Sequence, residues 1–165
     1  MMVNTSKQIS TIKNMVMMAF ENDTGIVAAL DRPDILDTQD LEYENIFPTW
    51  KVDDVELTKK TVICLKVNSS RVKTSDVVQR FHVDILIFTN IELQRTPLDS
   101  MMRGCTRLDY ISQRIEDILS RNTTIGLGET TLVYNKEDFI DNRHPCRIMR
   151  FETTGVNANW TFRGE

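Results

Sequence analysis

Residues 77–88, VVQRFHVDILIF, decide the fold class because they read as one long β-strand. Side chains alternate between the two sides of a strand, so every second residue shares a side. One side is apolar from Phe81 onwards and is expected to face the core; this run comprises Phe81, Val83, Ile85 and Ile87. The other side begins polar and ends apolar, in the order His82, Asp84, Leu86 and Phe88. We therefore expect a neighbouring element to cover this second side at its apolar end.

Further strands are expected on both sides of this segment. Residues 61–67, TVICLKV, read as a strand, and residues 43–50 contain Pro48, which suits a strand end or a sheet edge. Later in the chain, strands are expected at residues 130–134, 147–153 and 158–162. Turns are expected between them, at residues 126–128 and 135–138.

Two helices complete the pattern. Residues 6–21 carry apolar side chains at helical spacing, and Thr5 with Gln8 has the spacing of a capping box. Thr96 followed by Pro97 is typical of a helix start, which predicts a long helix over residues 97–121. Its apolar stripe consists of Leu98, Met102, Cys105, Leu108, Ile111, Ile115, Ile118 and Leu119. This element order predicts one α+β domain, residues 1–165, with both helices on one face of a largely antiparallel sheet.

Composition and charge limit the classes of function. The chain has 165 residues, of which 41% are hydrophobic and 27% are charged, as in an ordinary globular domain. A net charge of −4 argues against a general nucleic-acid binder. The three cysteines are far apart, and no apolar run approaches the ~20 residues that span a bilayer. We therefore expect a protein that folds in a cytoplasm without disulfides.

No pattern in the sequence predicts an active site. His82 and Asp84 share one side of a strand, and we expect a structural pair because nothing nearby supplies further metal ligands. His144 lies near Cys146, but no orienting group or oxyanion site accompanies them, so we expect an idle cysteine. The glycines of residues 126–128 are too closely spaced for a dinucleotide-binding motif. The expectation is therefore no catalytic residue, no metal and no cofactor in a protein that is not an enzyme.

Two charged features exceed what an ordinary domain requires. An acidic stretch precedes the strands and contains Asp31, Asp34, Asp37, Asp40, Glu42 and Glu44. Arginines spaced by four and seven residues follow one face of the predicted long helix: Arg103, Arg107, Arg114 and Arg121. Both sets are compatible with solvated surfaces. Together they also suit a head-to-tail ring, in which the arginines are candidates for the contact with the next subunit.

The order of elements between residues 43 and 151 resembles that of the tail-terminator and tail-completion proteins of tailed bacteriophages. The resemblance rests on IFPTW, TVICLKV, RFHVDILIF and the helical segment RLDYISQRIEDIL. An IGLGE turn then leads into two strands that end near RIMRF. Proteins of that family are small α+β subunits that form rings at the head-proximal end of the tail tube, and they have no catalytic residues to transfer.

The resemblance implies a virion structural protein that forms a homo-oligomeric ring, typically a hexamer, at the head–tail junction. It would be assembled in the host cytoplasm and located in the neck of the virion. The implied partners are further copies of itself, tail-tube proteins and head-connector proteins. DNA would pass through the ring passively, without sequence-specific binding, and no membrane would be contacted. Two other classes stay open, namely a small intracellular protein-binding or regulatory domain and a small enzyme.

Overall fold

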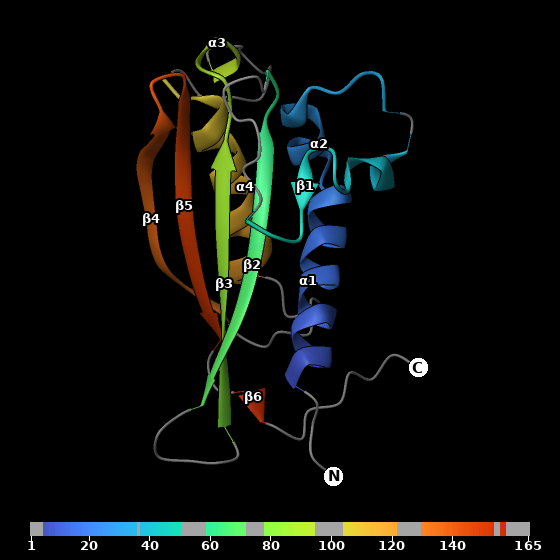
Figure 1. The fold of residues 1–165 in the computed structure, drawn as a ribbon, viewed down its shortest axis with the longest axis vertical. Helices are drawn as coiled ribbons and strands as arrows, with labels where there is room; N and C mark the ends of the chain where they lie inside the picture. The colour runs from blue at the N-terminus through green and yellow to red at the C-terminus, as the bar shows by residue number, and fades with distance from the viewer. Residues whose placement is uncertain are drawn as a thin grey trace.

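The computed structural model describes residues 5–35, 37–50, 59–71, 78–94, 104–121, 130–153 and 156–157. Its elements in chain order are α1 (Thr5–Glu21), α2 (Thr24–Leu30), the 3₁₀-helix η1 (Thr38–Leu41), β1 (Ile46–Phe47), β2 (Val62–Arg71), β3 (Val78–Phe88), α3 (Ile91–Gln94), α4 (Arg107–Arg121), β4 (Thr130–Asp141), β5 (His144–Thr153) and β6 (Val156–Asn157) (Figure 1).

One sheet organises the described chain. Its strand order is β1-β2-β3-β5-β4, and β6 also pairs with β3. The pairings are antiparallel except for the short parallel contact of β1 with β2. The predicted α+β class and the largely antiparallel sheet are therefore confirmed, and β3 lies at the centre as its apolar character indicates.

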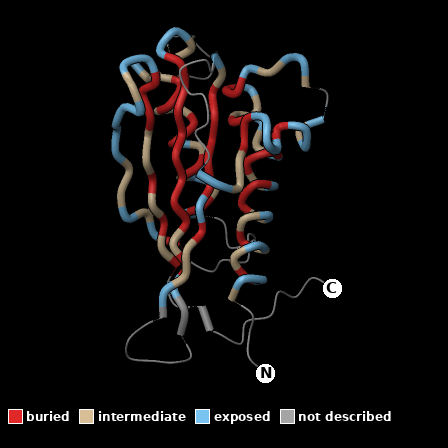
Figure 2. The backbone as a smooth tube through the Cα atoms, viewed as in Figure 1, coloured by how far each residue is buried: buried red, intermediate tan, exposed pale blue. Residues whose placement is uncertain are grey.

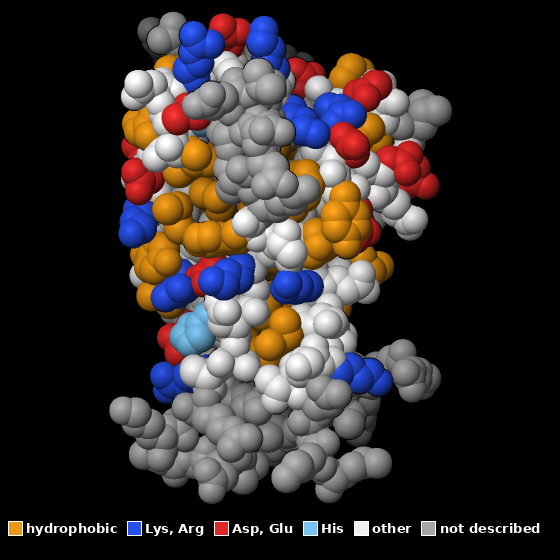
Figure 3. All heavy atoms as spheres, viewed as in Figure 1, with side chains coloured by type: hydrophobic (Ala, Val, Ile, Leu, Met, Phe, Trp, Pro, Cys, Tyr) orange, Lys and Arg blue, Asp and Glu red, His pale blue; other side chains and the backbone are white. Residues whose placement is uncertain are grey.

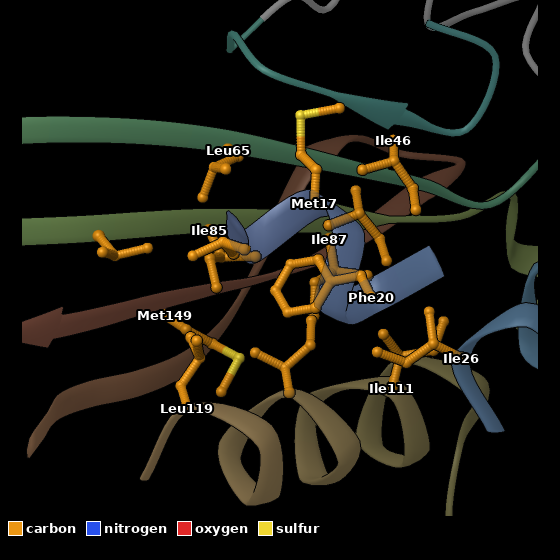
Figure 4. Packing of buried hydrophobic residues seen from close by; sticks show 14 of the residues in the cluster. Met17, Phe20, Ile26, Ile46, Leu65, Ile85, Ile87, Ile111, Leu119 and Met149 are labelled. Atoms are coloured by element: carbon orange, nitrogen blue, oxygen red, sulfur yellow. The ribbon is translucent and has the colours of Figure 1, made fainter. Parts of the chain in front are cut away.

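Both long helices pack on the same face of this sheet. The core between them and the strands includes Phe20 from α1, Ile111 from α4 and Ile85 from β3 (Figure 4). All four residues of the predicted core-facing side of β3 belong to this cluster: Phe81, Val83, Ile85 and Ile87. Buried backbone accordingly runs along the central strands and the facing side of α1 (Figure 2).

The opposite face, here called the second face, is divided along its length. At one end Leu86 and Phe88 are buried in a smaller apolar cluster with Val62, Cys64 and Cys146. Phe47 of β1 packs against that cluster, so the expected cover at the apolar end is present. Further along, Lys66 and Arg150 are the neighbours of Asp84 on either side. The change from apolar to polar therefore crosses several strands, and it is visible in Figure 3 as a band of Lys and Arg side chains below hydrophobic ones.

The strand boundaries near the C-terminus differ from the prediction. Residues 135–138 form no turn, because β4 continues through them to Asp141. Polar residues suit this strand because it is the last in the sheet and much of its surface faces solvent. The first residue of β5 is His144, earlier than the predicted 147. The predicted turn at 126–128 and the predicted strand at 158–162 lie outside the described residues.

The helix predicted at residues 97–121 begins at Arg107 instead. Thr106 and Asp109 cap it reciprocally: the Asp109 carboxylate accepts from the Thr106 N–H at 2.9 Å, and the Thr106 hydroxyl accepts from the Asp109 N–H at 3.2 Å. Gly104 precedes the helix with φ of +86°, a left-handed conformation that glycine adopts without strain. Residues 95–103, with the predicted start, lie outside the described residues. Four residues of the predicted stripe are buried as expected: Leu108, Ile111, Ile115 and Leu119.

Helix α1 agrees with its predicted range but not with its predicted cap. It begins at Thr5, and its buried apolar residues include Ile12 and Val16. The Gln8 amide is buried and has no hydrogen-bond partner among the described residues. The Gln8 half of the expected capping box is therefore not formed. None of the helices in the described segments is both long and apolar enough to cross a bilayer.

Candidate functional site

The histidine on the second face is not paired with its neighbouring carboxylate. Asp84 accepts two hydrogen bonds from Arg150, at 2.5 and 3.0 Å, and a third from Asn68 at 3.2 Å. The Nε2 atom of His82 instead lies 3.2 Å from the Ser70 hydroxyl. The expected His82–Asp84 pair is therefore wrong, because a cross-strand arginine binds the carboxylate. Within the described part of the chain, no group of three or more His, Cys, Asp or Glu residues is arranged to hold a metal ion.

The second histidine stabilises a turn. His144 is fully buried, and its Nδ1 lies 2.9 Å from the Asp141 carboxylate, which also accepts from the N–H of Arg143 at 2.7 Å. Burial raises the pKa of the nearby Cys146 thiol to about 11, and Asp138 adds to the effect. At neutral pH this thiol is protonated and is a poor nucleophile. His144 and Cys146 thus have structural roles, at the turn before β5 and in its first residues.

A shallow polar depression of about 370 Å³ lies beside the start of α4. Its lining includes Cys105, Asp109, Asn135 and Arg147. The guanidinium of Arg147 is already bonded to Asp109 at 2.9 Å through Nε and to Asn135 at 3.0 Å through Nη1. Burial raises the pKa of the Cys105 thiol, and Asp109 raises it further. The depression therefore offers neither an uncommitted cation nor an activated thiol.

The predicted row of four arginines is not one surface. Arg107 is fully buried, so it is excluded as a contact with another subunit. Arg114 is partly exposed and binds Asp23 through two hydrogen bonds, of 2.5 and 3.1 Å. Burial alone would raise the pKa of Asp23, but the Arg114 hydrogen bond and the Ile26 N–H lower it overall. Arg103 lies outside the described residues, as does the side chain of Arg121.

Arg107 joins three helices from within the protein. Its Nη1 donates to the Ala29 carbonyl at 2.6 Å, and its Nε donates to the Leu93 carbonyl at 3.0 Å. Ala29 lies in the last turn of α2 and Leu93 in α3, where carbonyls lack partners within the helix and attract a cation. Asp31, which ends α2, lies 3.6 Å from Nη2. Burial lowers the pKa of the guanidinium, and Asp31 opposes that effect.

The acidic stretch is exposed, and most of it has local roles. Asp37 caps η1 by accepting from the Gln39 N–H at 3.0 Å. The Arg32 hydrogen bond lowers the pKa of Asp34 to about 2. Asp31 ends α2 in a left-handed conformation, and Glu44 contacts Lys60 and Arg32. These roles explain much of the regular spacing. Three of these acids have no ion pair to a described residue, namely Asp37, Asp40 and Glu42, and of these Asp37 has the capping role.

A further carboxylate, Glu21, is buried at the end of α1 with 7% of its surface exposed. Burial raises its pKa, and the nearby charges of Glu42 and Asp37 raise it further. The negative end of the α1 dipole also disfavours a negative charge at this position. Glu21 is therefore a source of instability when it is ionised.

Replacing Glu21 with Gln is expected to raise the melting temperature at pH 7. A carboxyl whose folded-state pKa lies above the unfolded value of 4.5 contributes stability that is lost as the pH rises through the folded-state pKa. Glutamine has no such ionisation, so its advantage should shrink as the pH falls towards 4.5. Thermal melts of both proteins over this range measure the effect, with Glu92→Gln as an exposed control whose carboxylate does not act on Glu21. Equal melting temperatures of wild type and Glu21→Gln at pH 7 would contradict the expectation.

Exposed apolar side chains lie along one edge of the sheet. Val133, Phe139 and Ile140 lie on the edge strand β4 with 50%, 61% and 36% of their surfaces exposed. Near the opposite edge of the sheet Tyr43, in the turn that precedes β1, is 64% exposed. We missed these residues in the sequence because residues 135–138 were interpreted as a turn. The sequence does contain a signal for them, because apolar residues lie on both sides of the polar segment 135–138.

The fold and surfaces define a small α+β protein whose described residues form no metal cluster, and in which the pKa values of the Cys105 and Cys146 thiols are raised. A family model named YomW matches residues 11–153. The chain therefore belongs to the YomW family, a phage-associated family, and the protein is phage-related. A comparison with curated proteins finds no match.

Proposed function

We propose that this protein is a virion structural protein that forms a homo-oligomeric ring at the head–tail junction. In that position it ends the growth of the tail tube and docks the head connector. The observation that carries the proposal is membership of a phage-associated family over residues 11–153. The α+β class of the fold is compatible with the tail-terminator and tail-completion proteins that the sequence resembles.

Two features of the surface support an assembly role over catalysis. Large apolar side chains are exposed on the edge strand β4, and a monomer gains nothing from exposing them. The polar groups that commonly perform catalysis are engaged in structural contacts, as Asp84 is by Arg150 and Arg147 is by Asp109. We therefore place the function on the surface, in contacts with other copies and with tail and connector proteins.

The proposal is tested by deleting the gene from the phage genome that carries it and examining the lysate by electron microscopy. The expected result is full heads without attached tails, together with tails longer than the wild-type length. A plasmid copy of the gene should restore normal particles, whereas an empty plasmid should not. Normal numbers of complete virions with tails of normal length after deletion would overturn the proposal and favour the protein-binding or enzyme classes.

A further inference from the structure

We infer that the subunits join head to tail, with the β4 edge of one copy packed against the β1 end of the next. This inference rests on the proposed ring and specifies its interface. The β4 surface is defined by Val133, Phe139 and Ile140, together with the outer backbone of residues 134–139. The β1 surface is defined by Tyr43 and the neighbouring acids Asp40 and Glu42.

The backbone of β4 provides the first argument. Among the described strands β4 pairs with β5 alone, so the N–H and C=O groups on its other edge lack a strand partner. A long strand with such an edge is a template for another chain. Register shifts interrupt the pairing near Val133 and Ile140, and the ladder between them is regular. The exposed apolar side chains therefore flank the one regular stretch where a neighbour has continuous access.

Charge provides the second argument. At the β4 end, Lys136 and Arg143 are exposed, and neither forms an ion pair with a described residue. Of the acids beside them, Glu137 binds Arg147 at 2.9 Å, which leaves Asp138 as the one exposed acid of residues 136–143 that has a single backbone hydrogen bond, from the Phe139 N–H at 2.8 Å, and no ion pair to a described residue. At the β1 end the exposed charges without an ion pair to a described residue are mainly negative: Asp37, Asp40 and Glu42 outnumber Lys59. Bringing the two ends together therefore matches apolar with apolar surface and cations with acids.

The positions of the two surfaces determine the symmetry. They lie at opposite ends of the strand order β1-β2-β3-β5-β4, so the contact is heterologous and each subunit keeps one surface of each kind. Repetition of such a contact closes a ring when the rotation between copies allows it. A symmetric pairing of two β4 strands would stop at a dimer, would place Lys136 and Arg143 near their own copies, and would leave Tyr43 exposed.

Two single substitutions test the inference in the full-length protein, with mass in solution as the measurement. Phe139→Glu and Tyr43→Lys each place a charge in one of the two surfaces, with the sign that the facing surface repels, at side chains exposed enough for folding to continue. Each variant alone is expected to lose the oligomer and have the mass of one subunit at concentrations where wild type is oligomeric. An equimolar mixture is expected to form dimers only, because one intact pair of surfaces remains between the two variants.

The controls are Ser10→Glu and Ser10→Lys, which add the same charges to an exposed position of α1 and should leave the oligomer unchanged. Circular dichroism should show that all four variants are folded. An oligomeric wild type with an unchanged Phe139→Glu variant would overturn the interface and leave the proposed ring standing. Loss of the oligomer in Phe139→Glu but not in Tyr43→Lys would overturn the head-to-tail arrangement in favour of symmetric β4 pairing. A wild type that is monomeric at every concentration would overturn the ring and the interface together.

Discussion

Replacing Arg107 with Ala is expected to lower the free energy of unfolding by about 3–5 kcal/mol. The substitution leaves the buried Ala29 carbonyl without its donor, and an unmet buried acceptor costs about 1–3 kcal/mol. The Leu93 carbonyl also loses its donor, and the missing side chain leaves a cavity between α2, α3 and α4. Urea denaturation followed by circular dichroism measures the change.

Two further substitutions separate charge and geometry from general effects of losing an arginine. Arg107→Lys keeps the charge but lacks the planar fork that reaches both carbonyls, so it should lose less stability than Arg107→Ala. Arg80→Ala removes a half-exposed arginine that pairs with Glu152 at 3.1 Å, and it should cost less than about 1 kcal/mol. If Arg107→Ala also cost less than about 1 kcal/mol, Arg107 would be solvated in the protein, and its role in joining the helices would be refuted.

Ile115→Ala is expected to cost about 2–5 kcal/mol, the range for deleting most of a large buried aliphatic side chain. Ile115 is fully buried in the core between α4 and the sheet. The midpoint of urea denaturation should fall while the slope of the transition stays constant, because the surface exposed on unfolding hardly changes.

The matched control is Ile91→Ala, which makes the same chemical change at a side chain that is 40% exposed. Its expected cost is below about 1 kcal/mol, since little apolar surface is removed from the interior. Similar costs at both positions would show that α4 does not pack on the sheet through the face that contains Ile115.

Features that depend on local periodicity were predictable from the sequence. Residues 81–88 alternate with a period of two, and this identified the core-facing side of β3 and the apolar end of the second face. The apolar stripe of α4 was found in the same way through Leu108, Ile111 and Ile115. The start of α4 was not predicted correctly. The sequence analysis took Thr96 and Pro97 as the helix start, whereas the structure uses the capping box of Thr106 and Asp109.

Features that depend on distant parts of the chain were not predictable. Arg107 was assigned to the surface because nothing local shows that the ends of α2 and α3 meet its side chain. Its Ala29 partner is 78 residues away in the sequence. The same applies to Asp84, whose partner Arg150 comes from a strand 66 residues later. The assignment of residues 135–138 to a turn failed for a related reason, since only the sheet order shows that β4 is an edge strand.

The two irregularities in β4 bear on how the protein avoids uncontrolled aggregation. A bulge leaves one residue out of the ladder and increases the local twist. In β4 such breaks lie between Leu132 and Tyr134 and between Phe139 and Asp141. A strand from another molecule could therefore pair regularly only with the short stretch of β4 between these breaks. It could not shift its register along β4 without reaching one of them. Open-ended stacking into fibres needs a long, flat edge that tolerates such sliding, and this edge does not provide one.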